Sequence, residues 1–473
     1  MGILRRAVVA AAPLAAVGLA ASAQPAPAPG TWAIPSDAAI KAILADRIDA
    51  KHQGVGIVVG IIDARGRRII AHGALAKGDP RPLNGDTLFE IGSETKVFTS
   101  LLLTEAVRRG EVTLDEPIAK LLPATVKVPE RGGKQITLVD IATHTSGLPR
   151  MPNNFRPKDA ANPYADYTDE QLFQFVSGYT LTRDIGSQYE YSNLAVGLLG
   201  QALARRAGTD YPTLVRTRVT APLGMKDTTV ALTPALQARM AKGHNLALEP
   251  VSNWDIPALA GAGALRSTTN DMLTFLGAEL GFKATDLKPA MAAQLDVTRP
   301  TQSPAMKVAL GWHIVTTKNG DVIWHNGGTG GFRTWMGFDP KARVGVVVMT
   351  NASTATGGDD IGLHVIAGVP LASVKENPTL RPVVALTKAQ IDGLAGRYQL
   401  APAVVVTIVP YNDRLFAQLT GQQGAEIFPT SPTEVFWKTV DAQATFDRGP
   451  DGVATRLVLH QNGRDLPAPR VMP

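Results

Sequence analysis

The stretch FEIGSETKVFTSLLLTEAVRRGEV, from Phe89 to Val112, places Ser93 three residues before Lys96 at the start of a strongly apolar run. Apolar residues at helical spacing predict a buried helix over this run, which Gly110 can end. The free N–H groups and positive dipole end of a helix N-terminus favour an oxyanion. One helical turn brings the two side chains to the same spot, where a buried, neutral lysine can accept the serine proton.

On its own, the S-x-x-K pair also fits a structural interpretation, because serine is a favoured N-cap residue. Two further motifs favour catalysis. Tyr191-Ser192-Asn193 precedes a predicted helix, and His325-Asn326-Gly327 lies on a predicted strand, so the motifs follow one another at about 100 and about 130 residues. Another H-x-G, His52-Gln53-Gly54, precedes Ser93 and lies outside any such strand. It fits a solvated helix end.

The three motifs, in this order, resemble those of the serine β-lactamase and penicillin-binding-protein superfamily. The chain is similar in particular to the class C β-lactamase-like branch, with its D,D-carboxypeptidases and endopeptidases, D-aminopeptidases and β-lactamase-fold esterases. The resemblance covers roughly residues 35 to 365, and its further stretches are ITLVDIATHTSGLPR (136–150), PLGMKDTTV (222–230) and AGAGALRSTTNDMLTFL (260–276). Of these, THTSGLP is expected to line the pocket rim without a chemical role.

The resemblance implies a catalytic role for three side chains. Ser93 would be the nucleophile, with Lys96 as its base or proton relay. Tyr191 would be a phenol whose pKa, lowered by Lys96, lets it shuttle protons to the leaving group. The backbone N–H groups of Ser93 and Gly328 would form the oxyanion hole.

The remaining implied site residues bind substrate. Asn193 would hold a substrate amide, and the small residues Gly327 and Gly328 would let a substrate backbone lie alongside the strand. His325 matches the lysine of the third motif and would polarise the site or bind a substrate carboxylate or carbonyl. The histidine is the departure from the pattern, because it is mostly neutral at pH 7 whereas lysine is a permanent cation. Efficient β-lactamase activity is therefore not expected.

The expected fold is α/β (α+β), with a mostly antiparallel sheet flanked by helices and an all-helical lobe. The apolar run GVGIVVGIID (54–63) predicts a strand covered on both faces, and four strands follow from Leu310 onward. Ser36 and Ser267 are predicted helix N-caps. Residues 35–380 form the predicted hydrolase domain. Residues 386–473 alternate apolar and polar residues between turns and predict a separate all-β domain, either a barrel or a sandwich.

The first residues predict export. Residues 1–23 contain an arginine pair, an apolar run and Ala21-Ser22-Ala23, which is typical of a signal peptide cleaved after about Ala23. A membrane anchor is the alternative, but about 14 apolar residues fall short of the roughly 20 that span a bilayer. Residues 24–34 predict a disordered tether. The expected location is periplasmic or secreted, with the choice between Sec and twin-arginine export left open.

Composition and charge exclude several kinds of partner and of catalytic site. The net charge of +6 is scattered without a basic stripe, which argues against nucleic acid as a partner, and no further segment predicts a stable membrane span. The absence of cysteine removes thiol catalysis and thiolate metal sites. No cofactor and no metal are expected, and the sequence does not specify an oligomeric state.

The sequence predicts a serine hydrolase that acts through an acyl-enzyme on peptides containing D-amino acids, such as peptidoglycan stem peptides. β-Lactams would be slow substrates or acylating inhibitors. A carboxylesterase for short acyl esters is the alternative within the same class. A catalytically inactive binding protein of the same fold is the alternative of another class, and it gives no reason to keep Ser93, Lys96 and Tyr191 together.

Overall fold

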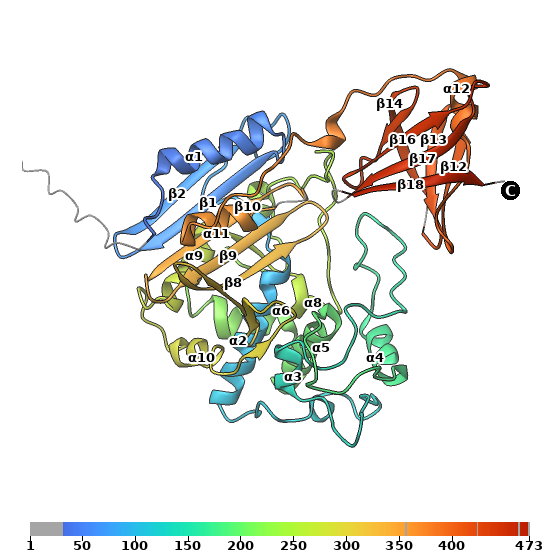
Figure 1. The fold of residues 1–473 in the computed structure, drawn as a ribbon. Helices are drawn as coiled ribbons and strands as arrows, with labels where there is room; N and C mark the ends of the chain where they lie inside the picture. Colours follow the sequence, from blue (N-terminus) through green and yellow to red (C-terminus); the bar gives the residue numbers. More distant parts are fainter. Residues whose placement is uncertain (1–31, 355–356, 423, 462–463, 472–473) are drawn as a thin grey trace, which may run out of the picture.

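The computed structural model describes residues 32–354, 357–422, 424–461 and 464–471. The predicted signal peptide lies outside these residues, as does most of the predicted tether. The described chain forms a large domain followed by a smaller all-β domain that stands beside it (Figure 1). Among the described helices, none combines the length and apolar character that crossing a membrane requires.

An antiparallel sheet of eight strands forms the centre of the large domain, in the order β2-β1-β10-β9-β8-β7-β6-β5. The strands are β1 (Gly56–Asp63), β2 (Gly66–Gly73), β5 (Arg299–Pro300), β6 (Met306–Val308), β7 (His313–Thr317), β8 (Gly320–Gly328), β9 (Arg333–Asp339) and β10 (Val344–Thr350). Strand β1 pairs with β10, and β2 pairs with β1 at the edge, so the N-terminal hairpin completes a sheet built mostly from the other end of the domain.

Strand β1 is apolar at almost every position because helices cover both of its faces. Val58 and Ile62 face the larger core, to which α2 (Thr95–Arg108) and α9 (Thr269–Glu279) contribute. The alternate residues, Ile57 among them, face a second core shared with α1 (Asp37–Ala45) and α11 (Asp359–Ala367). The predicted two-sided burial of this strand is confirmed.

Capping residues mark the starts of two of these helices. The Ser36 hydroxyl accepts a hydrogen bond from Ala39 N at 3.2 Å, as predicted. The predicted cap Ser267 is wrong by one position, because Thr268 accepts the bond from Asp271 N at the start of α9. Ser267 instead bonds the Thr228 hydroxyl at 2.8 Å.

A lobe of short helices packs against the same side of the sheet as α2 (Figure 1). Its helices are α3 (Leu138–Ala142), α4 (Asp169–Gly178), α5 (Asn193–Arg206), α6 (Tyr211–Val215) and α8 (Ala260–Gly263). Helix α2 lies between the sheet and this lobe and contacts α5 and α8. The start of α2 is thus close to residues from both halves of the domain, which positions the site described below.

The C-terminal domain is a closed antiparallel barrel of eight strands, which resolves the choice between barrel and sandwich. Its elements are α12 (Lys388–Leu394), β11 (Gly396–Ala401), β12 (Val404–Tyr411), β13 (Arg414–Leu419), β14 (Ala425–Ser431), β15 (Glu434–Phe436), β16 (Ala442–Arg448), β17 (Ala454–Gln461) and β18 (Arg464–Val471). The barrel closes where β11 pairs with β18. The expected fold class is confirmed in both domains.

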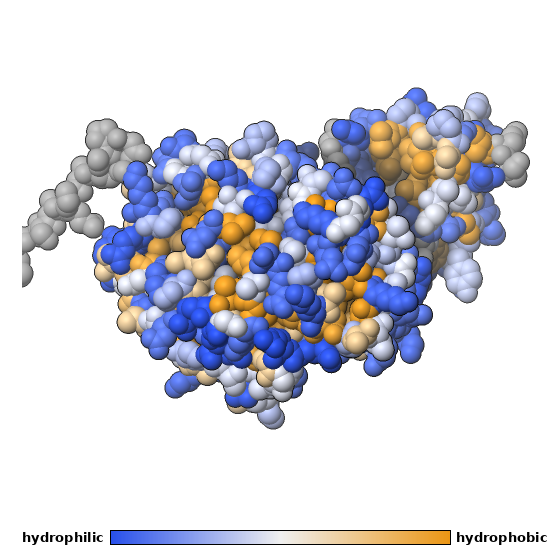
Figure 2. Space-filling model, turned by 90° about the horizontal axis from the view of Figure 1, so that it is seen from below, coloured by the Kyte–Doolittle hydropathy of each residue, from blue (hydrophilic) through white to orange (hydrophobic). Residues whose placement is uncertain are grey.

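Among the described residues, one ion pair links the barrel directly to the large domain: Lys438 Nζ lies 3.9 Å from Glu249 Oε1. Asn377 holds the connecting segment against the large domain by donating to Leu246 O at 2.8 Å. Figure 2 shows hydrophilic and hydrophobic residues interspersed over one face of the large domain, with a hydrophobic area on the barrel.

Candidate active site

Ser93 lies in a single 3-10 turn, Gly92–Glu94, immediately before α2. Glu94 occupies the N-cap position of α2, and in this described stretch no capping hydrogen bond involves the Ser93 hydroxyl. The structural interpretation of Ser93 as a cap is therefore not what the fold shows. The hydroxyl instead faces a partly open pocket.

Lys96 lies one turn further along α2 and is fully buried. Its Nζ is 3.0 Å from Ser93 Oγ and donates a hydrogen bond to Ala262 O at 2.6 Å. Burial, and then the charge of Arg150, lowers the pKa of Lys96 well below its usual value. A neutral amine at this distance can accept the serine proton while the Ala262 carbonyl holds it in place.

Tyr191 covers this amine, with the Lys96 Nζ 4.8 Å from the centre of the phenol ring. Burial raises the pKa of Tyr191, although interaction with the Ser93 side chain offsets part of the rise. The expectation that Lys96 lowers this pKa is wrong, because the amine is itself held toward its neutral form. The phenol is protonated at neutral pH and can donate a proton rather than accept one.

The loop THTSGLP holds the Y-S-N motif in place, which sequence analysis did not foresee. The His144 ring lies 4.5 Å from the Tyr191 ring, and His144 Nδ1 accepts a hydrogen bond from Ser192 N at 3.1 Å. The backbone carbonyl of His144 accepts another from Glu190 N at 2.8 Å. The buried His144 therefore helps to fix the orientation of the Tyr191 ring.

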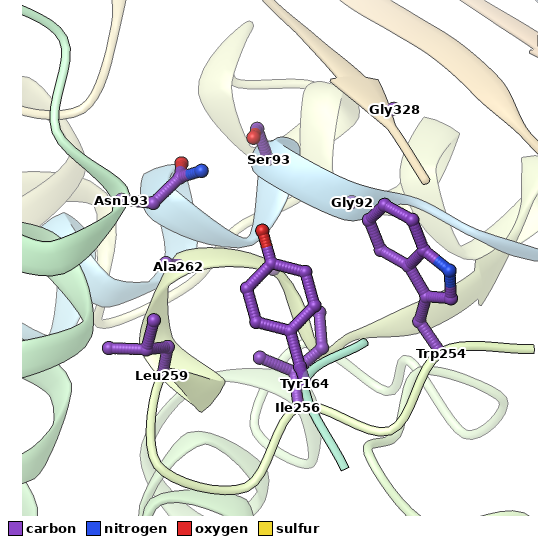
Figure 3. Close-up of a pocket in the computed structure, with 10 residues that line it drawn as sticks. Gly92, Ser93, Tyr164, Asn193, Trp254, Ile256, Leu259, Ala262 and Gly328 are labelled. Atoms are coloured by element: carbon purple, nitrogen blue, oxygen red, sulfur yellow. The ribbon is translucent and has the colours of Figure 1, made fainter. Parts of the chain in front are cut away.

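Asn193 is the first residue of α5, and Ser192 rather than Asn193 caps that helix. The Asn193 side chain reaches the pocket beside Ser93 (Figure 3). Its Oδ1 is buried without a hydrogen-bond partner among the described residues. An unpartnered amide oxygen at the pocket wall can accept a hydrogen bond from a substrate N–H group.

His325 was expected to contact the substrate, but its ring is buried away from the pocket. It is 1 % exposed and is not among the residues that line the pocket. Its ring lies 5.1 Å from that of His313 and 6.2 Å from that of Tyr191. Burial, and then the neighbouring His313, lowers the pKa of His325 well below its ordinary value. The assumption of an ordinary histidine pKa is therefore wrong, and this ring is neutral at physiological pH.

The glycines of β8 allow close approach of two backbones at the site. A Cβ atom on Gly327 would lie 1.9 Å from Ile91 O, and one on Gly92 would lie 2.7 Å from Gly328 N. Only glycine fits where the end of β8 crosses the turn that carries Ser93. Gly328 lies on the pocket wall with Ser93, the arrangement that a pair of oxyanion-hole N–H groups requires.

The pocket beside Ser93 has an aromatic and aliphatic wall that sequence analysis missed (Figure 3). Its lining residues are Gly92, Ser93, Tyr164, Asn193, Trp254, Ile256, Leu259, Ala262, Gly263 and Gly328. The rings of Tyr164 and Trp254 lie 5.3 Å apart, and Glu90 Oε1 accepts a hydrogen bond from Trp254 N at 2.8 Å. Both aromatic residues come from irregular loops, where hydrophobic periodicity carries no signal.

No cluster of three or more His, Asp or Glu side chains in the described part of the chain has the arrangement that holds a metal ion. The protein groups at the site are a serine, a buried amine, a phenol and backbone N–H donors. These groups suffice for acyl transfer by a serine nucleophile.

Comparison with known proteins gives matches over both domains. The β-lactamase family matches residues 37–369, and a domain of unknown function, DUF3471, matches residues 380–468. A D-alanyl-D-alanine-carboxypeptidase/endopeptidase of Escherichia coli, AmpH, is 32% identical over 327 residues, which is 66% of this chain and 83% of that protein. Penicillin-binding protein 4* of Bacillus subtilis is 24% identical over 456 residues, which is 90% of this chain and 97% of that protein.

A solved structure shows a similar large domain. The β-lactamase/D-alanine carboxypeptidase from Yersinia pestis in complex with citrate is 28% identical, with a TM-score of 0.61. The likeness covers 70% of this chain and 99% of that one. It therefore leaves about 30% of this chain without a counterpart there.

Proposed function

Because the chain belongs to the β-lactamase family and is a hydrolase of that family, we propose that it is a serine peptidase acting on peptides that contain D-amino acids. Ser93 would carry the acyl group. The observation that carries the proposal is the 3.0 Å separation between Ser93 Oγ and the fully buried Lys96 Nζ. The D-alanyl-D-alanine activity named for the relative from Escherichia coli supports the choice of substrate class.

Acylation begins with transfer of the Ser93 proton to the neutral amine of Lys96 as Oγ attacks the scissile carbonyl carbon. The negative charge that develops on the carbonyl oxygen is stabilised by the backbone N–H groups of Ser93 and Gly328. Tyr191, protonated because burial raises its pKa, donates a proton to the leaving amine as the C–N bond breaks. The proton on Lys96 then restores the phenol.

Deacylation uses the same groups in reverse order. A water molecule loses a proton to the Lys96–Tyr191 pair as its oxygen attacks the acyl carbon, and Ser93 leaves with a proton returned from Lys96. Asn193 orients the acyl group through its unpartnered Oδ1. The neutral His325 gives little attraction to a β-lactam carboxylate, so β-lactams are expected to acylate Ser93 slowly.

A second candidate function is a carboxylesterase for short acyl esters. The observation that favours it is the pocket wall of Tyr164, Trp254, Ile256 and Leu259, which presents aromatic and aliphatic surface beside Ser93. The alcohol of an ester leaves more readily than the amine of an amide, so ester cleavage depends less on a proton from Tyr191. The Tyr191→Phe variant therefore separates the two activities, since it should lower peptide hydrolysis far more than ester hydrolysis.

The test is intact mass spectrometry after incubation with a fluorescent penicillin or a fluorophosphonate. It is run beside assays of D-Ala-D-Ala peptide and p-nitrophenyl ester hydrolysis. Wild-type protein should gain the mass of one probe, and Ser93→Ala should gain none while its circular dichroism and Tm stay unchanged. Persistent labelling of the variant would assign the nucleophile to another serine. Failure of wild type to label or to turn over any substrate would instead support the inactive binding protein.

We also propose that the chain is exported, with the mature protein periplasmic or secreted. The basic pair and Ala21-Ser22-Ala23 of the first residues support this proposal. The same mass measurement on protein purified from a native host should show a chain beginning at Gln24. A full-length mass found with the cytoplasmic fraction would contradict export.

A further inference from the structure

We propose that Arg150 binds a free carboxylate on the leaving group of the substrate, and so makes the enzyme prefer C-terminal over internal peptide bonds. This inference rests on the proposed peptidase function. It assigns to Arg150 the recognition of negative charge, which the buried His325 does not present to a substrate.

The other cations of the site are buried or already engaged. Lys96 is fully buried and is used by Ser93, and the histidine in place of the third-motif lysine is buried and neutral. Arg333, near Gly328, is partly buried and donates from Nη1 to Thr329 O and Phe332 O. It also interacts with the carboxyl group of Asp359. None of these groups presents a free positive charge to a substrate.

Arg150 differs from them in being exposed and in having no acidic partner among the residues that the structure describes. Its guanidinium carbon lies 5.1 Å from the centre of the Tyr191 ring. No ion pair between described residues includes Arg150, whereas Arg183 in the same lobe is paired with Glu190 at 2.6 Å. A guanidinium that packs on an aromatic face keeps its edge N–H donors free, in the planar arrangement that binds a carboxylate.

The backbone of Arg150 is anchored to the active site. Its carbonyl oxygen accepts hydrogen bonds from Asn193 N at 3.0 Å and from Leu194 N at 3.3 Å, at the start of α5. Arg150 therefore moves with the Y-S-N motif. Because the adjoining Tyr191 supplies the leaving-group proton in the proposed mechanism, we expect a carboxylate on the leaving amino acid to come within reach of this guanidinium.

The kinetic test compares an N-acyl-D-Ala-D-Ala peptide with its C-terminal carboxamide, which has the same scissile bond and no charge. Wild type should prefer the carboxylate, and Arg150→Gln should reduce the ratio of the two kcat/KM values about tenfold, because it removes a charged hydrogen bond to the carboxylate. Arg150→Lys should keep part of the preference. The ratio cancels any change in Lys96 basicity that the lost charge causes, because both substrates use the same base.

Arg156→Gln is the matched control, because it removes an exposed arginine of the following loop whose one side-chain hydrogen bond to a described residue goes to its neighbour Phe155 O. It should leave the ratio unchanged. Calorimetry with Ser93→Ala protein, alone and combined with Arg150→Gln, measures the same preference as binding of the two peptides without turnover.

An unchanged ratio and unchanged binding in the Arg150→Gln proteins would overturn the inference, as would loss of the preference in Arg333→Gln instead. Labelling of Ser93 and hydrolysis of the carboxamide would still support the proposed function in that case. Failure of the proposed function would appear differently, as wild-type protein that neither labels at Ser93 nor hydrolyses either peptide. The Ser93→Ala binding data would then show whether Arg150 reads the carboxylate.

Discussion

Two cationic side chains contact the Tyr191 ring: the buried Lys96, at the floor of the active site, and the exposed Arg150, at the surface beside the site, which we call its mouth. At the floor, Lys96 Nζ lies 4.8 Å from the centre of the Tyr191 ring and is fully buried. At the mouth, the Arg150 guanidinium carbon lies 5.1 Å from that centre and is exposed. The two groups have the same formal charge at nearly the same distance from one ring.

Their surroundings give the two cations different chemistry. Burial makes the charged form of Lys96 costly, so its pKa falls and the neutral amine can act as a base. Arg150 is exposed, and its planar guanidinium can bind an anion through its N–H donors. The charge at the mouth also contributes to lowering the pKa at the floor. Proton transfer and charge recognition are thereby divided between two residues.

The largest effect is expected at the floor. Lys96→Arg keeps a hydrogen-bond donor but removes the neutral form, so acylation should fall by roughly two to four orders of magnitude, as for loss of a general base. Tyr191→Phe should cost a similar factor in peptide hydrolysis. Because both side chains serve one proton path, the double variant should lose little more than either single variant. Steady-state kcat/KM on a D-Ala-D-Ala peptide measures this.

Additive losses in the double variant would mean that Lys96 and Tyr191 act independently, which would break the assignment of the floor to one proton path. The acid side of the pH profile offers a second check. Activity should fall as pH drops through the lowered pKa of Lys96, because protonation removes the base. Arg156→Gln, which lies outside the site, should leave both the rate and the profile as in wild type.

An effect on stability is expected from the histidines around the floor. Burial, and then the charge of Lys96, lowers the pKa of His313 to about 4 from an ordinary value of 6.5. Below pH 6.5 the unfolded chain binds a proton that the folded chain does not, so stability falls as the pH falls from about 6.5 toward 4. The loss amounts to about 3 kcal/mol once pH is near 4.

Urea unfolding at pH 7 and at pH 4.5 measures this loss, and His313→Gln should show a smaller loss than wild type over the same interval. His72→Gln is the control, because His72 lies on the surface beside Asp49 at 2.7 Å and should not reduce the acid loss. Equal losses in wild type and in His313→Gln would show that His313 is already charged in the folded protein. Water would then solvate His313 more than its burial indicates.

The smallest effect is expected at His325. If the mouth alone reads substrate charge, the preference for a carboxylate over its carboxamide should vary less than about twofold between pH 7.5 and 5.5, since the buried ring stays neutral. His325→Gln should leave that preference unchanged. The preference could instead rise as the pH falls through about 6.5 and be lost in His325→Gln. That outcome would show that His325, and not Arg150 alone, recognises the substrate charge.

Local sequence patterns predicted the architecture well where burial leaves a regular trace. The continuous apolar run of β1 indicated a strand covered on both faces, and Gly110, which has a φ of 71°, ends the helix after Ser93 as expected. The cap of α9 was misplaced by one residue, because Ser267 and Thr268 are both good caps and only the packing decides which hydroxyl reaches Asp271 N. The closure of the barrel depends on pairing its first strand with its last, which no local pattern records.

The candidate site was predicted in part. The order of the three motifs, with the family resemblance that it carries, predicted that Ser93, Lys96 and Tyr191 share one site with Asn193 and Gly328. The aromatic wall of Tyr164 and Trp254 and the exposed Arg150 were missed. Their loops carry no periodicity. The tertiary fold alone brings Tyr164 and Trp254 to the pocket beside Ser93 and Arg150 to the Tyr191 ring.

The sequence by itself determined which reactive groups the protein possesses and in what order they occur, because residue identity and spacing are properties of the chain. Only the tertiary structure decided their protonation states, since a pKa depends on burial and on charges from distant segments. The amine of Lys96 and the ring of His325 are neutral because the fold removes them from water, and the Tyr191 phenol keeps its proton for the same reason. Arg150, exposed by the same fold, remains a charge at the mouth.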